Sequence, residues 1–388
     1  MTQIEQGSYP WRNWVASVTD ICDNRCPGCY RVEQDSLQPA SVQSNMSLSN
    51  FINILDIFTS QGIQDQTDDF VGGEPLLNPE VREMVQISLE RGLSSWIYTN
   101  LRQIARDPTL APFFKKMSDQ YPGRLTIVGK LNVANLNDPT QRKLQAELIG
   151  SDETGVNEMW EGLNILLRSG LPKGSIGIEN LIRVNNIEYA TDVYKLGIQM
   201  GFFADMELPT CPVTANRQGF QEWLNQKPTR DQVVTLIKDI NQVNREFGIK
   251  SFTPRPPHLT GRNSDGVGTG CISFKQGALL TETDGRLALC TSGLPLTDEN
   301  GRLLNIFTDP LETILNSPAV KRRRASTIQG TIQGPCGDCS AWNNCMAGCA
   351  ALRESVLGNV FASYPLCVYG EWMNDEKLTR EAFQNMKE

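Results

Sequence analysis

Short apolar strands alternate with amphipathic helices over the first two hundred residues of the chain. Trp14–Thr19 is predicted as a strand, and Ser49–Ser60 as a helix because apolar residues recur there on one face. The same patterns predict strands at Asp69–Val71, Trp96–Thr99, Leu125–Val128 with an extension to Val133, Ile176–Val184 and Phe202–Leu208, and helices at Pro79–Arg91, Asn157–Ser169 and Glu188–Met200. Such alternation is typical of a parallel sheet with helices outside it, so the fold class is α/β.

The pattern changes after residue 215, which divides the chain into three predicted parts. Residues 1–215 form the α/β unit, and residues 216–270 form a bridging region with one helix near Asp231–Phe247. The bridge ends in the Pro- and Gly-rich stretch TPRPPHLTGRNSDGVGTG, a composition that favours loops. Residues 271–388 are dominated by cysteines and turns and form a separate C-terminal domain.

The predicted strands of the α/β unit end in residues suited to chemistry. A cysteine-rich loop follows the first strand, Gly72-Gly73-Glu74-Pro75 follows the second, and Thr99-Asn100 ends the third. Reactive residues of parallel barrels lie at the C-terminal ends of strands. We therefore expect these three segments to meet at one site.

Composition excludes several classes of protein. The chain has 388 residues, of which 39% are apolar and 21% charged, with a net charge of −8, so nonspecific nucleic-acid binding is not expected. No stretch predicts a membrane span, and the N-terminal segment lacks the features of a signal peptide, which favours a cytoplasmic location. The one basic block, Lys321 to Arg324, is interpreted as a solvated helix end, or else as a contact for an acidic peptide or partner.

The eleven cysteines indicate metal rather than disulfides, because they cluster at short spacings in a chain without an export signal. His258 is the one histidine, which argues against His-rich zinc or non-haem iron sites. It lies in the bridging region and is expected to be a surface or packing residue.

Three cysteines near the N-terminus carry the strongest signal. Cys22, Cys26 and Cys29 have the spacing C-x3-C-x2-C. Three thiolates hold a 4Fe–4S cluster but leave one iron without a protein ligand, whereas clusters that only carry electrons normally have four. A zinc loop or a chance spacing is the alternative. With the GGEP turn that follows, the loop resembles that of the radical S-adenosylmethionine (SAM) superfamily.

That resemblance implies a partial (β/α)6 TIM-like barrel in which the open iron binds the amino and carboxylate groups of SAM. Gly72, Gly73, Glu74 and Pro75 match the turn that contacts the amino group of SAM in this family. A lone GGEP sequence is otherwise an ordinary turn. Asn100, at the end of the next strand, is a further candidate cofactor contact.

Two departures from the family pattern affect the other SAM contacts. Gly28 stands where many relatives have an aromatic residue, and Tyr30 follows the third cysteine instead, as the candidate adenine contact. The fourth strand reads Lys130-Leu131-Asn132-Val133 where many relatives have Ser-Leu-Asp-Gly. Lys130 and Arg183 are therefore candidate partners of the SAM carboxylate. The alternative for Lys130 is an ordinary exposed lysine at the end of a strand.

The tail contains a second cysteine pattern. Cys271 is followed by Gly285-x4-Cys290, by C-x2-C-x5-C-x3-C from Cys336 to Cys349, and by Cys367. This order resembles the SPASM domain of radical SAM enzymes, which binds two auxiliary 4Fe–4S clusters. The resemblance assigns Cys336, Cys339, Cys345 and Cys367 to an outer cluster and Cys271, Cys290 and Cys349 to an inner one. The inner cluster is left one ligand short, to be completed by another residue, water or substrate.

Three residues near the sixth strand are candidates for catalysis. Cys211 is interpreted as an inert buried thiol, a hydrogen-atom donor to a substrate radical, or the missing cluster ligand. Asp205 and Glu207 share one face of the strand by its period of two. Either is a candidate general base, or a structural or substrate-binding carboxylate.

The resemblance implies that one electron from the first cluster cleaves SAM to a 5′-deoxyadenosyl radical, which abstracts hydrogen from a substrate. A ribosomally synthesised peptide is the first substrate hypothesis, with crosslinking, excision or epimerisation as the outcome. The expected partners are a separate leader-recognition protein and an electron donor such as flavodoxin or ferredoxin. The alternatives are a small-molecule dehydrogenase or epimerase acting on a sugar or aminocyclitol, and a nonenzymatic electron carrier.

Overall fold

The computed structural model describes residues 13–29, 44–60, 67–211, 217–249, 259 and 278–385. Within these residues one sheet of eight strands has the order β6-β5-β4-β3-β2-β1-β7-β8. The strands are β1 (Asn13–Thr19), β2 (Thr67–Gly72), β3 (Ser94–Thr99), β4 (Leu125–Lys130), β5 (Ile176–Leu181), β6 (Phe203–Glu207), β7 (Ala278–Thr281) and β8 (Leu287–Ala288). Strands β1 to β6 pair in parallel, each with the next.

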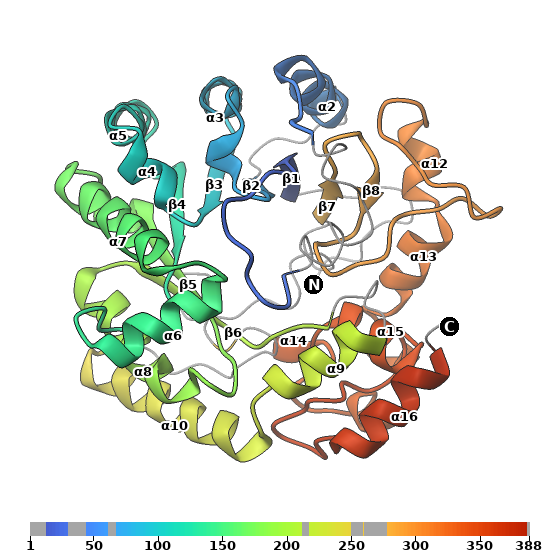
Figure 1. Ribbon diagram of the computed structural model, residues 1–388. Helices are drawn as coiled ribbons and strands as arrows, with labels where there is room; N and C mark the ends of the chain where they lie inside the picture. The colour runs from blue at the N-terminus through green and yellow to red at the C-terminus, as the bar shows by residue number, and fades with distance from the viewer. Residues whose placement is uncertain are drawn as a thin grey trace.

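Helices surround this sheet on the outside, and the strands curve into an open ring (Figure 1). The longer barrel helices are α2 (Leu48–Ser60), α3 (Val81–Glu90), α5 (Leu110–Gln120), α6 (Pro139–Ile149), α7 (Glu153–Arg168), α8 (Ile187–Met200), α9 (Arg217–Gln226) and α10 (Arg230–Glu246), and α4 (Arg102–Arg106) is a single short turn. The tail adds α12 (Leu311–Leu315), α13 (Pro318–Ala325), α14 (Trp342–Cys345), α15 (Ala350–Leu357) and α16 (Asp375–Asn385). The partial (β/α)6 barrel is confirmed.

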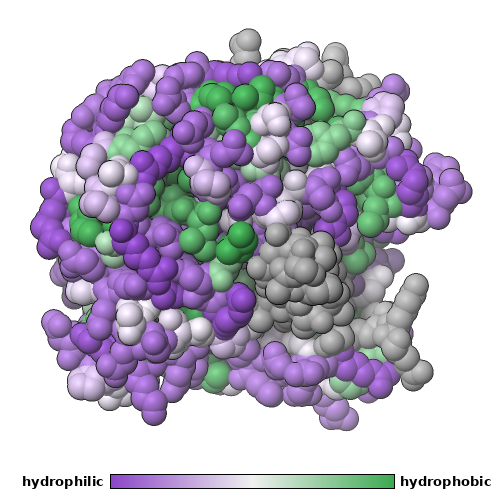
Figure 2. Space-filling view, turned by 45° about the horizontal axis from the view of Figure 1, so that its top comes forward, coloured by the Kyte–Doolittle hydropathy of each residue, from purple (hydrophilic) through white to green (hydrophobic). Residues whose placement is uncertain are grey.

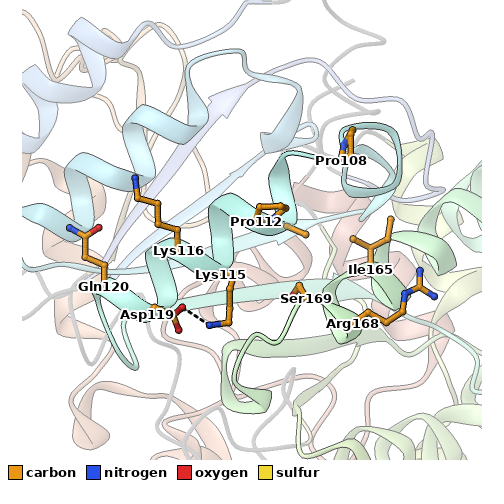
Figure 3. Close-up of a pocket in the computed structure, with 10 residues that line it drawn as sticks. Pro108, Pro112, Lys115, Lys116, Asp119, Gln120, Ile165, Arg168 and Ser169 are labelled. Atoms are coloured by element: carbon orange, nitrogen blue, oxygen red, sulfur yellow. Dashed lines mark hydrogen bonds and ion pairs between the residues drawn. The ribbon is translucent and has the colours of Figure 1, made fainter.

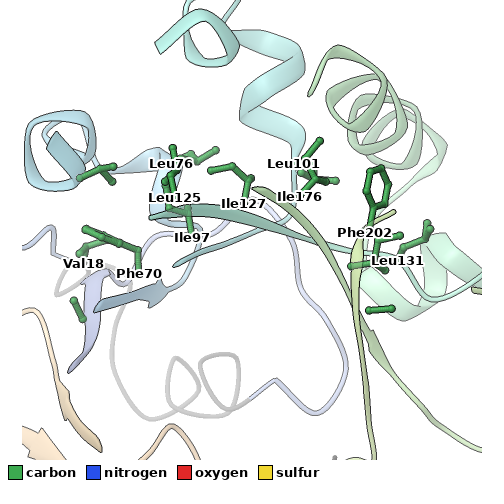
Figure 4. Packing of buried hydrophobic residues seen from close by; sticks show 14 of the residues in the cluster. Val18, Phe70, Leu76, Ile97, Leu101, Leu125, Ile127, Leu131, Ile176 and Phe202 are labelled. Carbon is green, nitrogen blue, oxygen red and sulfur yellow. The ribbon is translucent and has the colours of Figure 1, made fainter. Parts of the chain in front are cut away.

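Alternate residues of each strand face the helices and form the main core. Phe70, Ile97 and Ile127 are fully buried on this outer side of the sheet, where they meet apolar helix residues (Figure 4). The residues between them face the inside of the barrel, where the Trp96 and Phe203 rings meet edge to face at 5.3 Å between centroids. Polar side chains of Lys130, Glu179 and Asp205 also lie on this inner face.

Several element boundaries differ from the sequence prediction. Strand β5 ends at Leu181 rather than Val184, because the Asn186 side chain accepts a hydrogen bond from the Arg183 backbone N–H at 2.6 Å. Helix α7 begins at Glu153, four residues earlier than predicted, because the Asp152 side chain caps it. The helices α4, α5 and α6 were not predicted.

The described part of the predicted bridging region, residues 217–249, contains two helices where the sequence predicted one. Helix α10 begins with a capping box formed by Thr229 and Gln232, and α8 packs against it through a 2.7 Å hydrogen bond from the Tyr194 hydroxyl to Asn244. Helix α9 precedes it and was missed because few apolar residues mark its pattern. Its Trp223 lies in a second apolar cluster shared with the tail.

The tail is joined to the barrel by its first strand. Strand β7 pairs in parallel with β1, and the Trp14 indole N–H donates to the Thr281 hydroxyl at 2.9 Å. The second apolar cluster then packs α9, α15 and α16 around Cys336 and Cys349. The barrel and the tail therefore share both a sheet and a core.

The visible surface is mainly hydrophilic, with apolar residues in scattered groups (Figure 2). Among the helices that the structure describes, none is both long enough and apolar enough to cross a bilayer.

Gly162 is predicted to be required where α7 crosses α4. A Cβ there would lie 2.1 Å from the backbone oxygen of Leu101, and backbone cannot yield as a side chain does. We expect Gly162→Ala to destabilise the protein by about 1–3 kcal/mol, because the clash outweighs the gain of about 1 kcal/mol in helix propensity. Chemical denaturation measures this, with Gly174→Ala as control because nothing lies within 4 Å of a Cβ there. Equal midpoints for the two variants would contradict the prediction.

Candidate cofactor site

The Gly72-Gly73 turn is bound directly to the end of β1. The backbone N–H of Gly73 donates to the Thr19 oxygen at 2.7 Å, and that of Glu74 donates to the Ile21 oxygen at 2.8 Å. A Cβ on Gly72 would lie 2.2 Å from the Thr19 oxygen, and a Cβ on Gly73 would lie 2.1 Å from the Ile21 oxygen. Two glycines are thus needed for the turn to reach the segment that leads into the cysteine loop.

Glu74 is buried beneath this turn, and both of its carboxylate oxygens accept hydrogen bonds. Its carboxylate accepts hydrogen bonds from the Thr99 hydroxyl at 2.7 Å, from the Asn100 backbone N–H at 2.6 Å and from the Leu76 backbone N–H at 3.1 Å. Burial raises its pKa to about 7, although these three hydrogen bonds oppose the shift. Pro75 begins the short 3-10 turn that places Leu76 there.

Two arginines of helix α4 form hydrogen bonds with the cysteine loop. Arg102 donates through Nη1 to the Asp23 backbone oxygen at 2.6 Å and to Asn24 Oδ1 at 2.8 Å. Arg106 donates to the Asp23 carboxylate at 2.6 Å, and Asn100 Nδ2 donates to its other oxygen, also at 2.6 Å. This set of contacts, here called the α4 clamp, fixes the residues between the first two cysteines.

Glu158 on α7 completes the α4 clamp. Arg102 Nε donates to Glu158 at 2.8 Å and Arg106 Nε donates at 2.9 Å. The Arg106 hydrogen bonds are the largest cause of the lowered pKa of Glu158. The Arg102 side chain is only 9% exposed. The charge-assisted hydrogen bonds offset the free-energy cost of removing its charge from water.

Cys22, Cys26 and Cys29 lie together on the loop after β1, each partly exposed. Burial raises the pKa of the Cys22 thiol to about 12, with further increments from Glu74 and the two other cysteines. Burial also raises the pKa of Cys26, whereas Lys130 and other nearby positive charge lower it. The three thiols therefore share one electrostatic environment.

Lys130 ends β4 on the inner face of the barrel. Its ammonium lies 3.5 Å from the Glu179 carboxylate on β5. Burial lowers the pKa of Lys130, but Glu179, Cys26 and Cys29 outweigh it, so the net shift is upward. The side chain is thus a charged group beside the cysteine loop and not a free surface lysine.

Arg183 reaches the same place from the segment after β5. Its Nη2 donates to the Pro27 backbone oxygen at 2.6 Å, and its Nε is buried with no hydrogen-bond acceptor among the described residues. Burial lowers its pKa, while Cys26 and Cys29 act in the opposite direction. A buried guanidinium with an unused donor beside the thiols suits an anionic ligand such as a carboxylate.

Asp205 and Glu207 lie on β6. In the strand register Lys130, Glu179 and Asp205 are direct neighbours across β4, β5 and β6, so the three share the inner face. Asp205 is 1% exposed, and Glu207 is half-buried near the barrel mouth. These carboxylates therefore line the same interior as Lys130.

Cys211 follows β6 but packs into the second apolar cluster. Its side chain is fully buried, and its backbone oxygen accepts a hydrogen bond from the Ser355 hydroxyl at 3.2 Å. Ser355 lies on α15, the helix that begins directly after Cys349. Cys211 therefore lies against the tail, in the same apolar cluster as Cys349.

The four cysteines assigned to the outer cluster influence one another. Burial raises the pKa of Cys367, and the thiolates of Cys336 and Cys339 raise it further. Burial likewise raises the pKa of Tyr369 to about 12, together with Cys345 and Cys367. Cys336 and Cys339 are thus within electrostatic range of Cys367, and Cys345 and Cys367 are both within range of Tyr369.

Tyr364 connects the two groups of tail cysteines with the barrel. Burial raises its pKa well above the usual value, and negative charge on Cys349, Cys345, Cys367 and Glu207 raises it further. Its phenol is therefore near the mouth of β6 as well as both cysteine groups. The sequence analysis did not identify Tyr364.

The cysteine groups offer thiolates, which are the ligands that iron–sulfur clusters use. Among the described residues, no three Cys, His, Asp or Glu side chains converge closely enough to hold one metal ion. A cubane has a different requirement, because each thiolate binds a separate iron. The orphaned Arg183 Nε, together with Lys130, further suits an anionic ligand at the first loop.

Some predicted residues lie outside the described part of the chain, namely Tyr30, Cys271 and His258. Conversely, Asp23, Arg102, Arg106 and Glu158 were missed by the sequence analysis. The spacing of Arg102 and Arg106 by four residues, directly after Thr99-Asn100, is the signal that would have indicated a basic helix face below the site.

A surface groove between α5 and α7 lies on the outside of the barrel (Figure 3). It is lined by Pro108, Ala111, Pro112, Lys115, Lys116, Asp119, Gln120, Ile165, Arg168 and Ser169. Lys115 forms an ion pair with Asp119 along its edge. None of the predicted site residues lines this groove.

Comparison with known proteins supports the fold through structure alone. No protein-family model matches the sequence, and no curated protein matches it significantly. Native anSMEcpe with bound AdoMet has a TM-score of 0.59 at 13% identity, over 96% of this chain and 97% of that one. Streptococcus suis SuiB bound to S-adenosylmethionine has a TM-score of 0.63 at 17% identity, over 89% and 74%.

A second SuiB structure, bound to precursor peptide SuiA, has a TM-score of 0.64 at 15% identity, over 92% of this chain and 75% of that one. At such identities the likeness concerns the fold. It confirms the fold, a partial barrel followed by a cysteine-rich region.

The α4 clamp is predicted to order the cysteine loop. Arg102→Met would leave the Asp23 carbonyl and Asn24 without their donor, at a cost of about 2–4 kcal/mol. We expect faster amide hydrogen exchange over residues 22–29 in the metal-free protein. Arg168→Met is the control, because Arg168 pairs with Glu161 on an exposed surface, where an ion pair contributes little. Unchanged exchange in the Arg102 variant would show that the loop is held by other contacts.

Proposed function

We propose that this protein is a radical SAM/SPASM enzyme that modifies a ribosomally synthesised peptide. One arrangement carries the proposal: three thiols, the Gly72-Gly73-Glu74 turn and the cations Lys130 and Arg183 meet at the C-terminal ends of adjacent parallel strands. The fold likeness supports it, since solved neighbours contain AdoMet or a precursor peptide.

Each residue of this arrangement has a role in the proposal. Cys22, Cys26 and Cys29 hold a 4Fe–4S cluster, which supplies the electron for reductive cleavage of SAM to a 5′-deoxyadenosyl radical. Glu74 accepts from the amino group of SAM, and Arg183 and Lys130 donate to its carboxylate. The negative charge of Glu74 near Cys22 and the positive charges of Lys130 and Arg183 near Cys26 orient the amino acid end of SAM.

The interior of the barrel determines what happens to the substrate. Asp205 and Glu207 are the candidates to hold or accept a proton there, beside Glu179. The apolar walls formed by Trp96 and Phe203 exclude water, which protects a reactive intermediate from side reactions. Cys211 is buried against the tail, which favours a role near the inner cysteine group over a role as hydrogen donor.

The tail is proposed to hold two auxiliary 4Fe–4S clusters. The outer one uses Cys336, Cys339, Cys345 and Cys367, and the inner one uses Cys290 and Cys349 with Cys271. A separate leader-recognition protein and an electron donor remain the expected partners, and the expected location is cytoplasmic. Mass spectrometry of a candidate peptide, incubated with enzyme, reductant and SAM, identifies the reaction from the mass change.

Cys26→Ala is expected to abolish formation of 5′-deoxyadenosine, because a cubane held by two thiolates is lost. Cys339→Ala is the matched comparison and is expected to retain some SAM cleavage while product formation stops. Chromatography of 5′-deoxyadenosine and peptide product in anaerobic reactions with dithionite measures both. SAM cleavage by Cys26→Ala would contradict the assignment of the first loop, and no cleavage by the wild-type enzyme would refute the function.

SAM binding is expected to weaken as the pH falls from 7 to 6. The pKa of Glu74 is about 7, and its ionised form accepts a stronger hydrogen bond from the amino group of SAM than its neutral form does, so acid weakens the contact. The loss is roughly fivefold, since the ionised fraction falls from one half to about a tenth. Equilibrium binding to the cluster-loaded enzyme measures this, and Glu74→Gln should bind weakly without the pH slope. A wild-type affinity that stays constant over this range would exclude the role of Glu74.

A further inference from the structure

The basic block of the tail is not a uniformly solvated helix end, as the sequence analysis expected. Arg323 is 3% exposed and forms a 2.5 Å ion pair with Glu354 on α15. This contact fixes α13 against the helix that follows Cys349. Lys321 and Arg322, in contrast, are exposed: Arg322 lies 3.6 Å from the Glu354 carboxylate with its side chain 54% exposed, and Lys321 forms no ion pair with any described residue. The block therefore has one inward anchor and an outward cationic face.

Two exposed apolar side chains lie close to the cysteines assigned to the outer cluster. Ile328 and Tyr369 are 59% and 55% exposed, the highest values among the exposed large apolar residues of the described chain. Ile328 follows the basic block, and its neighbour Gln329 donates to the Cys339 backbone oxygen at 3.0 Å. Tyr369 follows Cys367 by two residues, and burial together with the negative charge of Cys345 and Cys367 raises its pKa. Both side chains thus flank the outer cysteine group.

The outer cysteines are themselves close to the surface. Cys339, Cys345 and Cys367 of the outer group are partly exposed and Cys336 is buried, whereas of the inner group Cys290 is partly exposed and Cys349 is buried. Three of the four outer cysteines are therefore near enough to the surface for a partner protein to approach them. Asp338 and Glu371 are the exposed carboxylates nearest in sequence to these cysteines. The exposed positive charges near the outer group are therefore those of Lys321 and Arg322 on α13.

We propose that Lys321, Arg322, Ile328 and Tyr369 form a docking surface for an acidic one-electron carrier protein, which reduces the outer cluster. This inference rests on the proposed function, because it needs a cluster at the outer cysteines. The carrier loses one electron and the cluster gains it, and no bond or proton is exchanged. The occupant follows from charge: a cationic patch on a chain of net charge −8 selects a more acidic partner in one orientation.

The composition of the surface matches such a transient complex. Electron-transfer complexes bury little area and dissociate quickly, so a few apolar contacts with a charged rim are sufficient. Ile328 and Tyr369 supply the apolar contacts, and the α13 cations supply the steering charge. The electrostatic part is screened by salt, which gives the complex a characteristic dependence on ionic strength.

Binding of an oxidised flavodoxin to the cluster-loaded enzyme tests the surface without any turnover. Lys321→Glu/Arg322→Glu is expected to weaken binding roughly tenfold at low salt, because the charge reversal turns attraction into repulsion. Ile328→Ser is expected to weaken binding at low and high salt alike, and it leaves the charges unchanged. Lys377→Glu/Arg380→Glu on α16 makes the same change in net charge elsewhere on the tail and is expected to bind like wild type.

Two further measurements separate this inference from the proposed function. Stopped-flow absorbance follows reduction of the auxiliary clusters by reduced flavodoxin, which should slow in the α13 variant, while 5′-deoxyadenosine formation with dithionite should not change. Equal flavodoxin binding by the α13 and α16 variants would overturn the docking surface even if SAM cleavage is intact. Binding of an acidic peptide, but not flavodoxin, at the α13 face would also overturn it.

Discussion

The close contact between the Gly72-Gly73 turn and the end of β1 is the constraint on which the site depends. Two backbone hydrogen bonds join the turn to Thr19 and Ile21, and neither glycine position has room for a side chain. The same contact brings Glu74 under the turn and the cysteine loop over it. One local constraint thereby sets the distance between the cysteine loop and the glycine turn, which follow different strands.

A second layer of contacts gives the cysteine loop a defined shape. The α4 clamp binds Asp23 and Asn24 from one side, and the Arg25 backbone N–H donates to the Gly150 oxygen from the other. Helices outside the sheet thus position residues at its end. Charged groups on the inside, from Lys130 to Asp205, then meet a ligand in a place that is already built.

The sequence predicted much of the fold because strands and helices of a parallel barrel have regular patterns. The strand ends with Cys22, Gly72 and Asn100 were located correctly because glycine, proline and cysteine mark turns and metal sites by type alone. The α4 clamp was not predicted, because nothing in the sequence shows that Arg102 and Arg106 reach back across more than seventy-five residues to Asp23. Helix α9 was missed for another reason: its burial depends on tail residues distant in sequence. Long-range partners, rather than local propensity, account for these failures.

The parallel pairing of β1 with β7 has a consequence for how the protein matures. Trp14 and Thr281 are hydrogen-bonded across 267 residues, so the first strand gains its outer neighbour only when most of the chain exists. Contacts of such high contact order form late, and an edge strand that waits for its partner is open to aggregation. We expect any iron–sulfur cluster to be inserted after release from the ribosome. The newly made chain then depends on chaperones until β1 and β7 have paired.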